Sequence, residues 1–185
     1  VWQDFARAYY HVPSGECYVG SFAEGIVVLK DGEVQRIYND ANSGLVSKGG
    51  RNRVSGMVVD NQDNLWVTQI INDFPIHVLT PDGEWYRYRP TNMDPIGIIL
   101  DDYDNKWIIN QGQGIVVYSD NFTPEDPSDD QVKRLTTDFN RGGLPTNSVF
   151  AIAQDRDEQI WVGTSDGLSI LHDPSIVRTN DFQHP

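Results

Sequence analysis

The sequence predicts an all-β protein, a β-propeller of about four four-stranded blades that forms part of a larger propeller. Three observations support this prediction. One pattern of apolar segments recurs four times along the chain, each copy carries a large aromatic residue at the same place, and these aromatics recur at the interval of propeller blades.

The fourth copy of the pattern is the clearest. The apolar segment 148–155 leads through a polar turn to the segment 160–163, which contains Trp161. The second and third copies follow the same plan around a tryptophan, and the first is degenerate, with a tyrosine in its place. The structural anchors of the repeat are Tyr18, Trp66, Trp107 and Trp161, together with Gly163 and Gly167.

The spacing and composition of the copies distinguish between repeat architectures. Consecutive aromatic anchors lie 48, 41 and 54 residues apart, and periods of about 40–50 residues belong to propellers or helical arrays. The segments are short, rich in β-branched and aromatic residues, and bounded by Asp, Asn, Gly and Pro, which indicates strands. The pattern therefore favours the propeller.

Each copy is expected to supply one blade. The blades are expected at residues 4–38, 54–89, 96–136 and 147–185, as one propeller segment covering 1–185. Their inner strands are apolar on both faces, as required where each sheet stacks on a neighbour on either side, so we expect the large aromatics to be wedged between blades. Residues 172–185 are polar and irregular and show no obvious fourth strand. A segment of a larger propeller is favoured over a small closed ring, and its open blade edges make self-association an expectation.

Composition and charge exclude several classes of partner. The 185 residues carry a net charge of −13, and so acidic a surface repels nucleic-acid phosphates. The single cysteine, Cys17, allows neither an internal disulfide nor a cysteine-based zinc site. No apolar run reaches the roughly 18 residues of a membrane span, and no signal peptide is recognisable.

The fourth copy carries a family resemblance. Residues 143–168 combine a Leu-Pro-x-Asn lead-in with Trp161-Val162-Gly163-Thr164 and a following Gly-Leu pair, and they resemble the two-component regulator propeller repeat. The longer segment 121–175 is similar to the propeller region of PorZ-like proteins of the type IX (Por) secretion system. That resemblance implies export to the cell surface, outer membrane or periplasm, protein partners in a surface secretion complex that includes a sortase, and contact with anionic lipopolysaccharide or glycan.

Three function classes follow. The first is a non-catalytic binding or scaffold module of such a secretion apparatus. The second is the extracytoplasmic sensor of a hybrid two-component regulator that binds an oligosaccharide. The third, a propeller enzyme, requires a central cluster of His and carboxylate residues that the sequence does not indicate. We therefore expect no enzyme activity, no catalytic residues and no cofactor.

Two loops are the candidate ligand-binding surface. One is the basic, Gly-rich segment 47–53, and the other is the segment 70–75. In a propeller, the connections from the fourth strand to the next blade and from the second to the third strand lie on one face, so exposed apolar groups and arginines would meet there and dock a protein or an anionic glycan. An ordinary long connection is the alternative. The candidate residues are Lys48, Arg51, Arg53, Ile70, Ile71 and Phe74.

The remaining motifs favour structural roles. Gly163-Thr164-Ser165-Asp166-Gly167 fits the G-x-S-x-G nucleophile elbow, but that elbow needs a strand-to-helix turn and here strands are predicted on both sides. The histidines lack metal-ligand spacing and are expected to be structural or solvated. The acidic segment 120–130 lacks the EF-hand spacing and is expected to be a solvated connection rather than a calcium site. The four histidines are His11, His77, His172 and His184.

Overall fold

The computed structural model describes residues 4–178 and shows an all-β chain. The described part contains fifteen strands and two short 3-10 helices. The strands are β1 (Phe5–His11), β2 (Glu16–Ser21), β3 (Gly25–Lys30), β4 (Glu33–Tyr38), β5 (Val54–Val59), β6 (Leu65–Gln69), β7 (Ile76–Leu79), β8 (Trp85–Tyr88), β9 (Pro95–Leu100), β10 (Lys106–Asn110), β11 (Ile115–Ser119), β12 (Gln131–Leu135), β13 (Val149–Gln154), β14 (Ile160–Thr164) and β15 (Gly167–Leu171), and the helices are η1 (Phe139–Arg141) and η2 (Pro174–Arg178).

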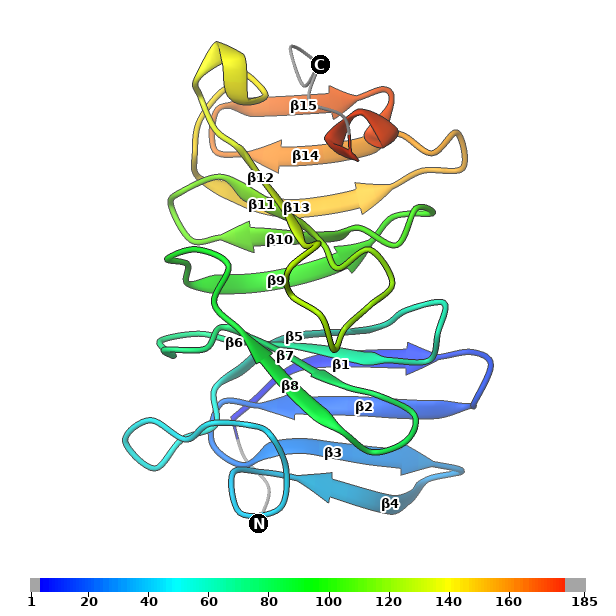
Figure 1. Cartoon of the computed structure of the whole chain (residues 1–185). Coiled ribbons are helices and arrows are strands. Elements are labelled where there is room, and N and C mark those ends of the chain that lie inside the picture. The colour runs from blue at the N-terminus through cyan, green and yellow to red at the C-terminus, as the bar shows by residue number, and fades with distance from the viewer. Residues whose placement is uncertain (1–3, 179–185) are drawn as a thin grey trace. The chain divides into compact units, whose positions relative to one another are not determined.

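Every sheet is an antiparallel meander in which the strand order follows the sequence (Figure 1). The first three sheets, β1–β4, β5–β8 and β9–β12, have four strands each, and β13–β15 form a three-stranded sheet. This is the architecture of propeller blades, so the predicted all-β propeller is confirmed. The fourth sheet departs from the four-stranded plan, because within residues 172–178 the chain forms η2 and adds no strand.

The hairpins between the first and second strands of blades two to four share one backbone feature. A residue other than glycine adopts a positive φ in each of them: Asp63 at 64°, Asp104 at 65° and Glu158 at 64°. Asp is one of the few residues that visit this region readily, because its short polar side chain can form local hydrogen bonds. The recurring Asp-Asn pairs are therefore turn residues.

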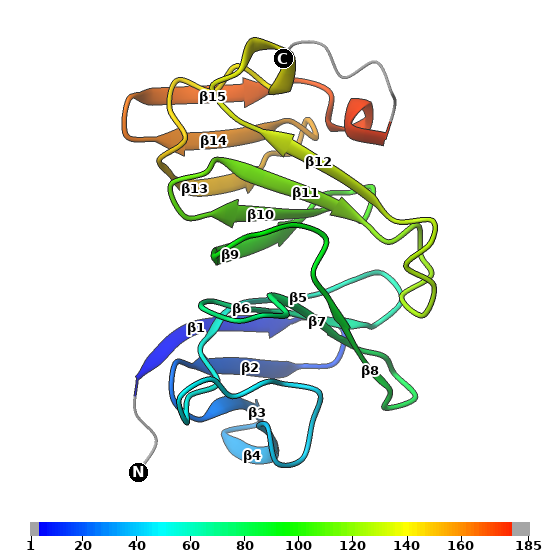
Figure 2. The same ribbon diagram turned by 60° about the vertical axis from the view of Figure 1, so that its left-hand side comes forward.

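The chain divides into two compact units, Val1–Gly97 and Ile98–Pro185. In the first unit, β5 packs against β1 and β2, so the first two sheets lie face to face (Figure 2). Gly20 allows their close approach, since a Cβ at this position would lie 2.7 Å from Cγ1 of Val54. The interface is an apolar cluster of Tyr18, Ile26, Val28, Leu45, Val54, Met57, Val59, Leu65 and Val67.

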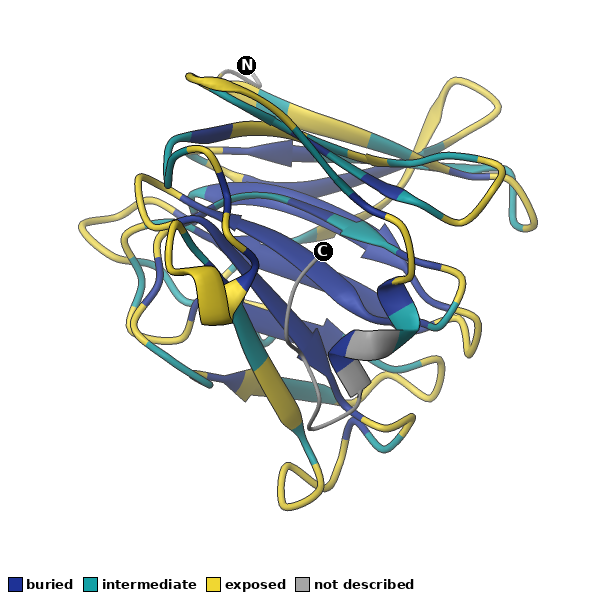
Figure 3. Ribbon diagram, turned by 90° about the horizontal axis from the view of Figure 1, so that it is seen from above, coloured by how far each residue is buried: buried dark blue, intermediate teal, exposed yellow. Residues whose placement is uncertain are grey.

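In the second unit, β10 packs against β13. Trp107 and Tyr118 are both fully buried, and they lie on opposite faces of their sheet, because Trp107 pairs with Val117 while Tyr118 pairs with Lys106. Burial thus concentrates in the central strands of the blades, and the connections at the strand ends are largely exposed (Figure 3).

The anchor of the last sheet differs from the others. Trp66 and Trp107 are fully buried, whereas Trp161 is only half-buried, so the expectation that all anchors are enclosed between sheets is wrong for Trp161. Its cross-strand neighbour Ala153 is exposed, and Leu168 on the same face is 58% exposed. Within the described chain this face is open to solvent, and self-association through it remains a prediction.

The difference between the two tryptophans predicts different effects on stability. Trp107→Ala should lower the free energy of unfolding by about 3–5 kcal/mol, because a fully buried side chain leaves a cavity. Trp161→Ala should cost less than about 2 kcal/mol, because that ring is partly solvated in the folded state. Urea unfolding of the two variants tests this. Equal losses, or an unchanged Trp107→Ala protein, would contradict the packing.

Candidate functional site

A hydrogen bond that we call the Asp–Trp clasp joins each anchor tryptophan to the Asp six residues before it. In the second blade, Nε1 of Trp66 donates to Oδ2 of Asp60 at 2.7 Å. Oδ1 of Asp60 accepts the backbone N–H groups of Gln62 and Asn64 at 2.9 and 2.8 Å. One carboxylate therefore closes the hairpin and fixes the indole at the same time.

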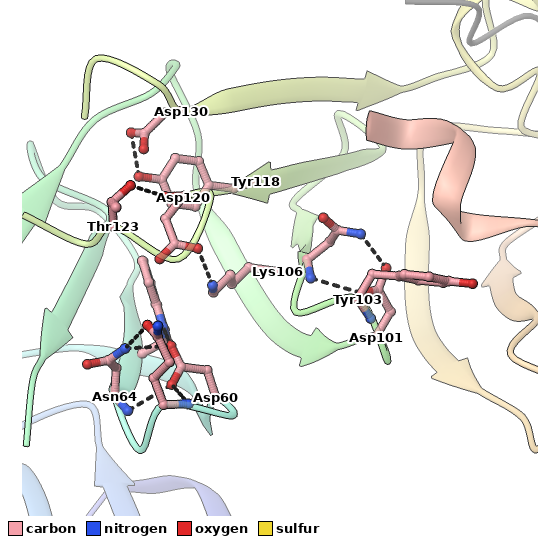
Figure 4. A network of polar contacts seen from close by, with 12 residues as sticks. Asp60, Asn64, Asp101, Tyr103, Lys106, Tyr118, Asp120, Thr123 and Asp130 are labelled. Carbon is pink, nitrogen blue, oxygen red and sulfur yellow. Dashed lines mark hydrogen bonds and ion pairs between the residues drawn. The ribbon is translucent and has the colours of Figure 1, made fainter. Parts of the chain in front are cut away.

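The clasp recurs in the third and fourth blades. Nε1 of Trp107 donates to Asp101 at 2.7 Å, and Nε1 of Trp161 donates to Asp155 at 2.6 Å. Figure 4 shows Asp101 and, separately, the Asp60–Asn64 pair. The hydrogen bond from Trp161 lowers the pKa of the Asp155 carboxyl from its usual value. These carboxylates are thus engaged by donors of the protein itself.

The first blade replaces the clasp with a different arrangement. The hydroxyl of Tyr18 donates to Oε2 of Glu16 at 2.8 Å, and Oε1 of Glu16 pairs with the Arg36 guanidinium at 2.5 Å. Burial, followed by the contact with Glu16, raises the pKa of Tyr18. Tyr18, which the sequence predicts as the anchor of this blade, lies in β2 within the apolar cluster of the first unit. No pattern in the sequence indicates the Glu16–Arg36 pair.

The segment with the nucleophile-elbow spacing is a hairpin. Gly163 lies in β14 and Gly167 begins β15, with a φ of 121° that favours glycine. The backbone N–H of Ser165 donates to the carbonyl of Ser148 at 3.0 Å. A strand precedes and a strand follows the motif, so it lacks the strand-to-helix geometry of the elbow.

The six candidate binding residues lie on two loops of the first unit, and we call them the loop surface: Lys48, Arg51, Arg53, Ile70, Ile71 and Phe74. The two loops are tied together. Lys48 Nζ lies 3.2 Å from Oδ1 of Asp73, and the N–H of Ile70 donates to the carbonyl of Arg53 at 3.1 Å. The structure therefore brings these residues together at one end of the strands.

Two of the basic groups of the loop surface are paired with carboxylates that the sequence does not indicate. Asp73 and Asp4 lie 3.2 Å from the charged groups of Lys48 and Arg51, respectively. Ile71 is 54% exposed and Phe74 is 40% exposed, and the Arg87 guanidinium lies 5.2 Å from the centre of the Phe74 ring. The surface thus presents apolar groups beside charges that are already paired.

The acidic connection between β11 and β12 is held by donors of the protein. Lys106 Nζ pairs with Oδ1 of Asp120 at 2.5 Å, and both side chains are buried. The hydroxyl of Tyr118 donates to Asp130 at 2.6 Å (Figure 4). The hydroxyl of Thr123 donates to Asp129 at 3.0 Å. Among residues 4–178 no group of three His, Cys, Asp or Glu side chains is arranged to hold a metal ion. The sequence showed the acidic residues but not the buried lysine that neutralises Asp120.

The described histidines are dispersed. His11 lies at the end of β1, His172 is exposed after β15, and His184 lies outside the described residues. His77 is fully buried in β7, where Nδ1 lies 3.1 Å from the carbonyl oxygen of Gly44. Burial lowers the pKa of His77 to about 4, so it is neutral in the folded state near pH 7.

This depressed pKa predicts a pH dependence of stability. In the unfolded chain His77 becomes protonated below about pH 6.5, whereas in the folded chain it becomes protonated only near pH 4. The free energy of unfolding should therefore fall as the pH is lowered through this window, by up to about 1.4 kcal/mol per pH unit for the single proton. His77→Gln, which keeps a donor for Gly44, should remove this component.

Urea unfolding of both proteins at pH 7, 5.5 and 4.5 measures the effect. The carboxyl groups are common to both proteins, so they cancel in the difference. A difference between the two proteins that stays constant with pH would contradict the buried neutral histidine.

Comparison with known proteins gives one family match and several structural ones. Residues 143–166 match the two component regulator propeller family, so the resemblance of the fourth copy to this repeat is confirmed. No curated protein matches the sequence. Among the described residues, no helix is both long and apolar enough to cross a membrane.

The structural matches share the propeller fold at low identity. PorZ, a bacterial surface component of the type-IX secretion system of Porphyromonas gingivalis, matches with a TM-score of 0.80 and 20% identity over 96% of this chain and 26% of its own. The extracellular domain of a putative hybrid two component system from B. thetaiotaomicron matches with a TM-score of 0.67 and 21% sequence identity. The match covers 90% of this chain and 21% of that protein. Virginiamycin B lyase from Staphylococcus aureus matches with a TM-score of 0.61 and 16% sequence identity, over 92% of this chain and 56% of the lyase. The chain spans about a quarter of the length of PorZ.

Proposed function

We propose that this chain is a non-catalytic binding or scaffold segment of an exported surface protein that works in a type IX secretion apparatus. The observation that carries the proposal is the loop surface, where exposed Ile71 and Phe74 lie on one loop, 70–75, that an ion pair ties to the neighbouring loop 47–53. Apolar side chains held on a braced backbone lose little conformational entropy on binding, which suits protein docking. The similarity to PorZ supports the secretion setting.

The charges of the loop surface favour a protein partner over an anionic glycan. Lys48 and Arg51 each lie beside a carboxylate, so an anion would have to displace an existing ion pair. A protein partner gains instead from covering the apolar groups Ile71 and Phe74. The Arg87 guanidinium, 5.2 Å from the centre of the Phe74 ring, contacts that ring within the chain. Lipopolysaccharide remains the second ligand to test.

Absence of catalysis forms part of the proposal. The elbow-like motif is a hairpin, and the described histidines are dispersed over separate elements. Catalysis requires a nucleophile, a base and an orienting group within reach of one another. The likeness to virginiamycin B lyase, at 16% identity, concerns the fold.

A second candidate function is ligand sensing by a two-component regulator. The family match at residues 143–166 and the similarity to extracellular domains of two component systems support it. In that case the ligand is an oligosaccharide and the chain forms part of a larger extracellular sensor.

Substitution of an exposed apolar residue tests the loop surface. Ile71→Asn removes the apolar group and suits the φ of 55°, which Asn tolerates. We expect it to weaken binding to purified type IX components of the sortase complex about tenfold, as for a central interface residue. Biolayer interferometry measures the affinity.

Phe122→Asn provides the matched control, because Phe122 is also exposed, at 42%, and has a φ of 64°, but lies outside the loop surface. It should leave binding unchanged. Binding to oligosaccharides in place of the secretion components would favour the sensor. Equal effects of the two variants, or no binding to any of these ligands, would overturn the role of the loop surface.

A further inference from the structure

The first unit contains a cavity at the end of the strands opposite the loop surface. It lies between the β1–β2 turn and the β5–β6 turn and has a volume of about 290 Å³, at the lower end of the range of small-molecule sites. Its walls include His11, Ser14, Glu16, Tyr18, Val59 and Asp63. In the sequence, only the degenerate first copy of the repeat marks this position.

The cavity coincides with the point at which the first blade departs from the repeat. In the other three blades an Asp directly follows the first strand and its carboxylate accepts the indole N–H of a tryptophan. In the first blade His11 ends that strand, Glu16 is its cross-strand partner, and Tyr18 replaces the indole. Three departures that meet at one cavity indicate a site, since local rules are broken most often where function requires it.

Hydrogen-bond acceptors dominate the walls. The Glu16 carboxylate accepts hydrogen bonds from the Tyr18 hydroxyl and the Arg36 guanidinium. Each of its oxygens has a further lone pair that can accept another hydrogen bond. The Asp63 side chain is 72% exposed and its Oδ1 lies 3.8 Å from Nε2 of His11, beyond hydrogen-bond distance. In the fourth blade the corresponding turn residue, Glu158, accepts the Tyr103 hydroxyl at 2.9 Å.

We propose that this cavity binds the alkylammonium or guanidinium group of a lysine or arginine side chain on a protein partner. The exposed Asp63 carboxylate supplies the charge, and Glu16, whose own charge is balanced by Arg36, adds an acceptor oxygen. The Tyr18 and Val59 side chains supply an apolar wall for the aliphatic stem. The net charge of −13 attracts a basic partner from a distance. The site is separate from the loop surface, so either can fail without the other.

Side-chain analogues test the proposal by NMR. Nα-acetyl-lysine amide and Nα-acetyl-arginine amide should shift the backbone amide signals of Gly15 and Asp63 saturably, with a dissociation constant of about 1 mM for so small a ligand. The neutral Nα-acetyl-norleucine amide should not. Added salt should weaken the binding, because the attraction is between charges.

Two matched variants locate the binding. Asp63→Asn should weaken it at least about fivefold, the loss of one partly exposed charged contact. Asp31→Asn should change it less than about twofold, although Asp31 is also an exposed turn residue with positive φ, 54° against 64°, and its loss alters the net charge equally. Asn suits both backbones, so both variants should fold.

Three results would overturn the proposal. These are equal shifts by the norleucine analogue, unchanged affinity in Asp63→Asn, and stronger shifts of the same amide signals by glucose than by the cationic analogues. The last result would assign the cavity to a polyol instead.

Discussion

The hydrogen bond from an anchor indole to the Asp six residues before it organises each of the last three blades. Asp60 and Asp101 are buried, and burial of a carboxylate is unfavourable unless donors surround it. In both, two backbone N–H groups, an Asn amide and the indole meet that requirement. The same contacts set the hairpin and the direction of the tryptophan, which then packs on the face of the sheet.

This constraint separates the part of the blade that must stay constant from the parts that can vary. The clasp occupies the turn between the first and second strands, so the opposite end of the strands is left free for long connections. In the first unit those connections carry Ile71 and Phe74 into solvent. The first blade lacks the Asp–Trp clasp and has Glu16 and Tyr18 instead, and a cavity lined by hydrogen-bond acceptors lies at this turn.

Much of this could be predicted from the sequence. The blades, the hairpin role of the Asp-Asn pairs and the anchor positions follow from periodicity and turn chemistry, which are local properties. The half-exposure of Trp161 could not be predicted, because it depends on what covers a sheet face. The ion pairs could not be predicted either, because no local sequence pattern links their members. The partners are separated by 25 residues for Lys48 and Asp73, 47 for Arg51 and Asp4, and 14 for Lys106 and Asp120. The cavity at His11 could not be predicted, because the sequence shows at this position only that the first copy of the repeat is degenerate.

Hydrogen exchange at the indole N–H groups, followed by NMR, tests the clasp most directly. The account predicts that the Trp107 indole proton exchanges at least about a hundredfold more slowly than that of free tryptophan, because exchange requires opening of a buried hydrogen bond. The half-buried Trp161 should exchange faster than Trp107. Exchange of the Trp107 indole at the free rate would contradict the clasp and, with it, the packing of the blades.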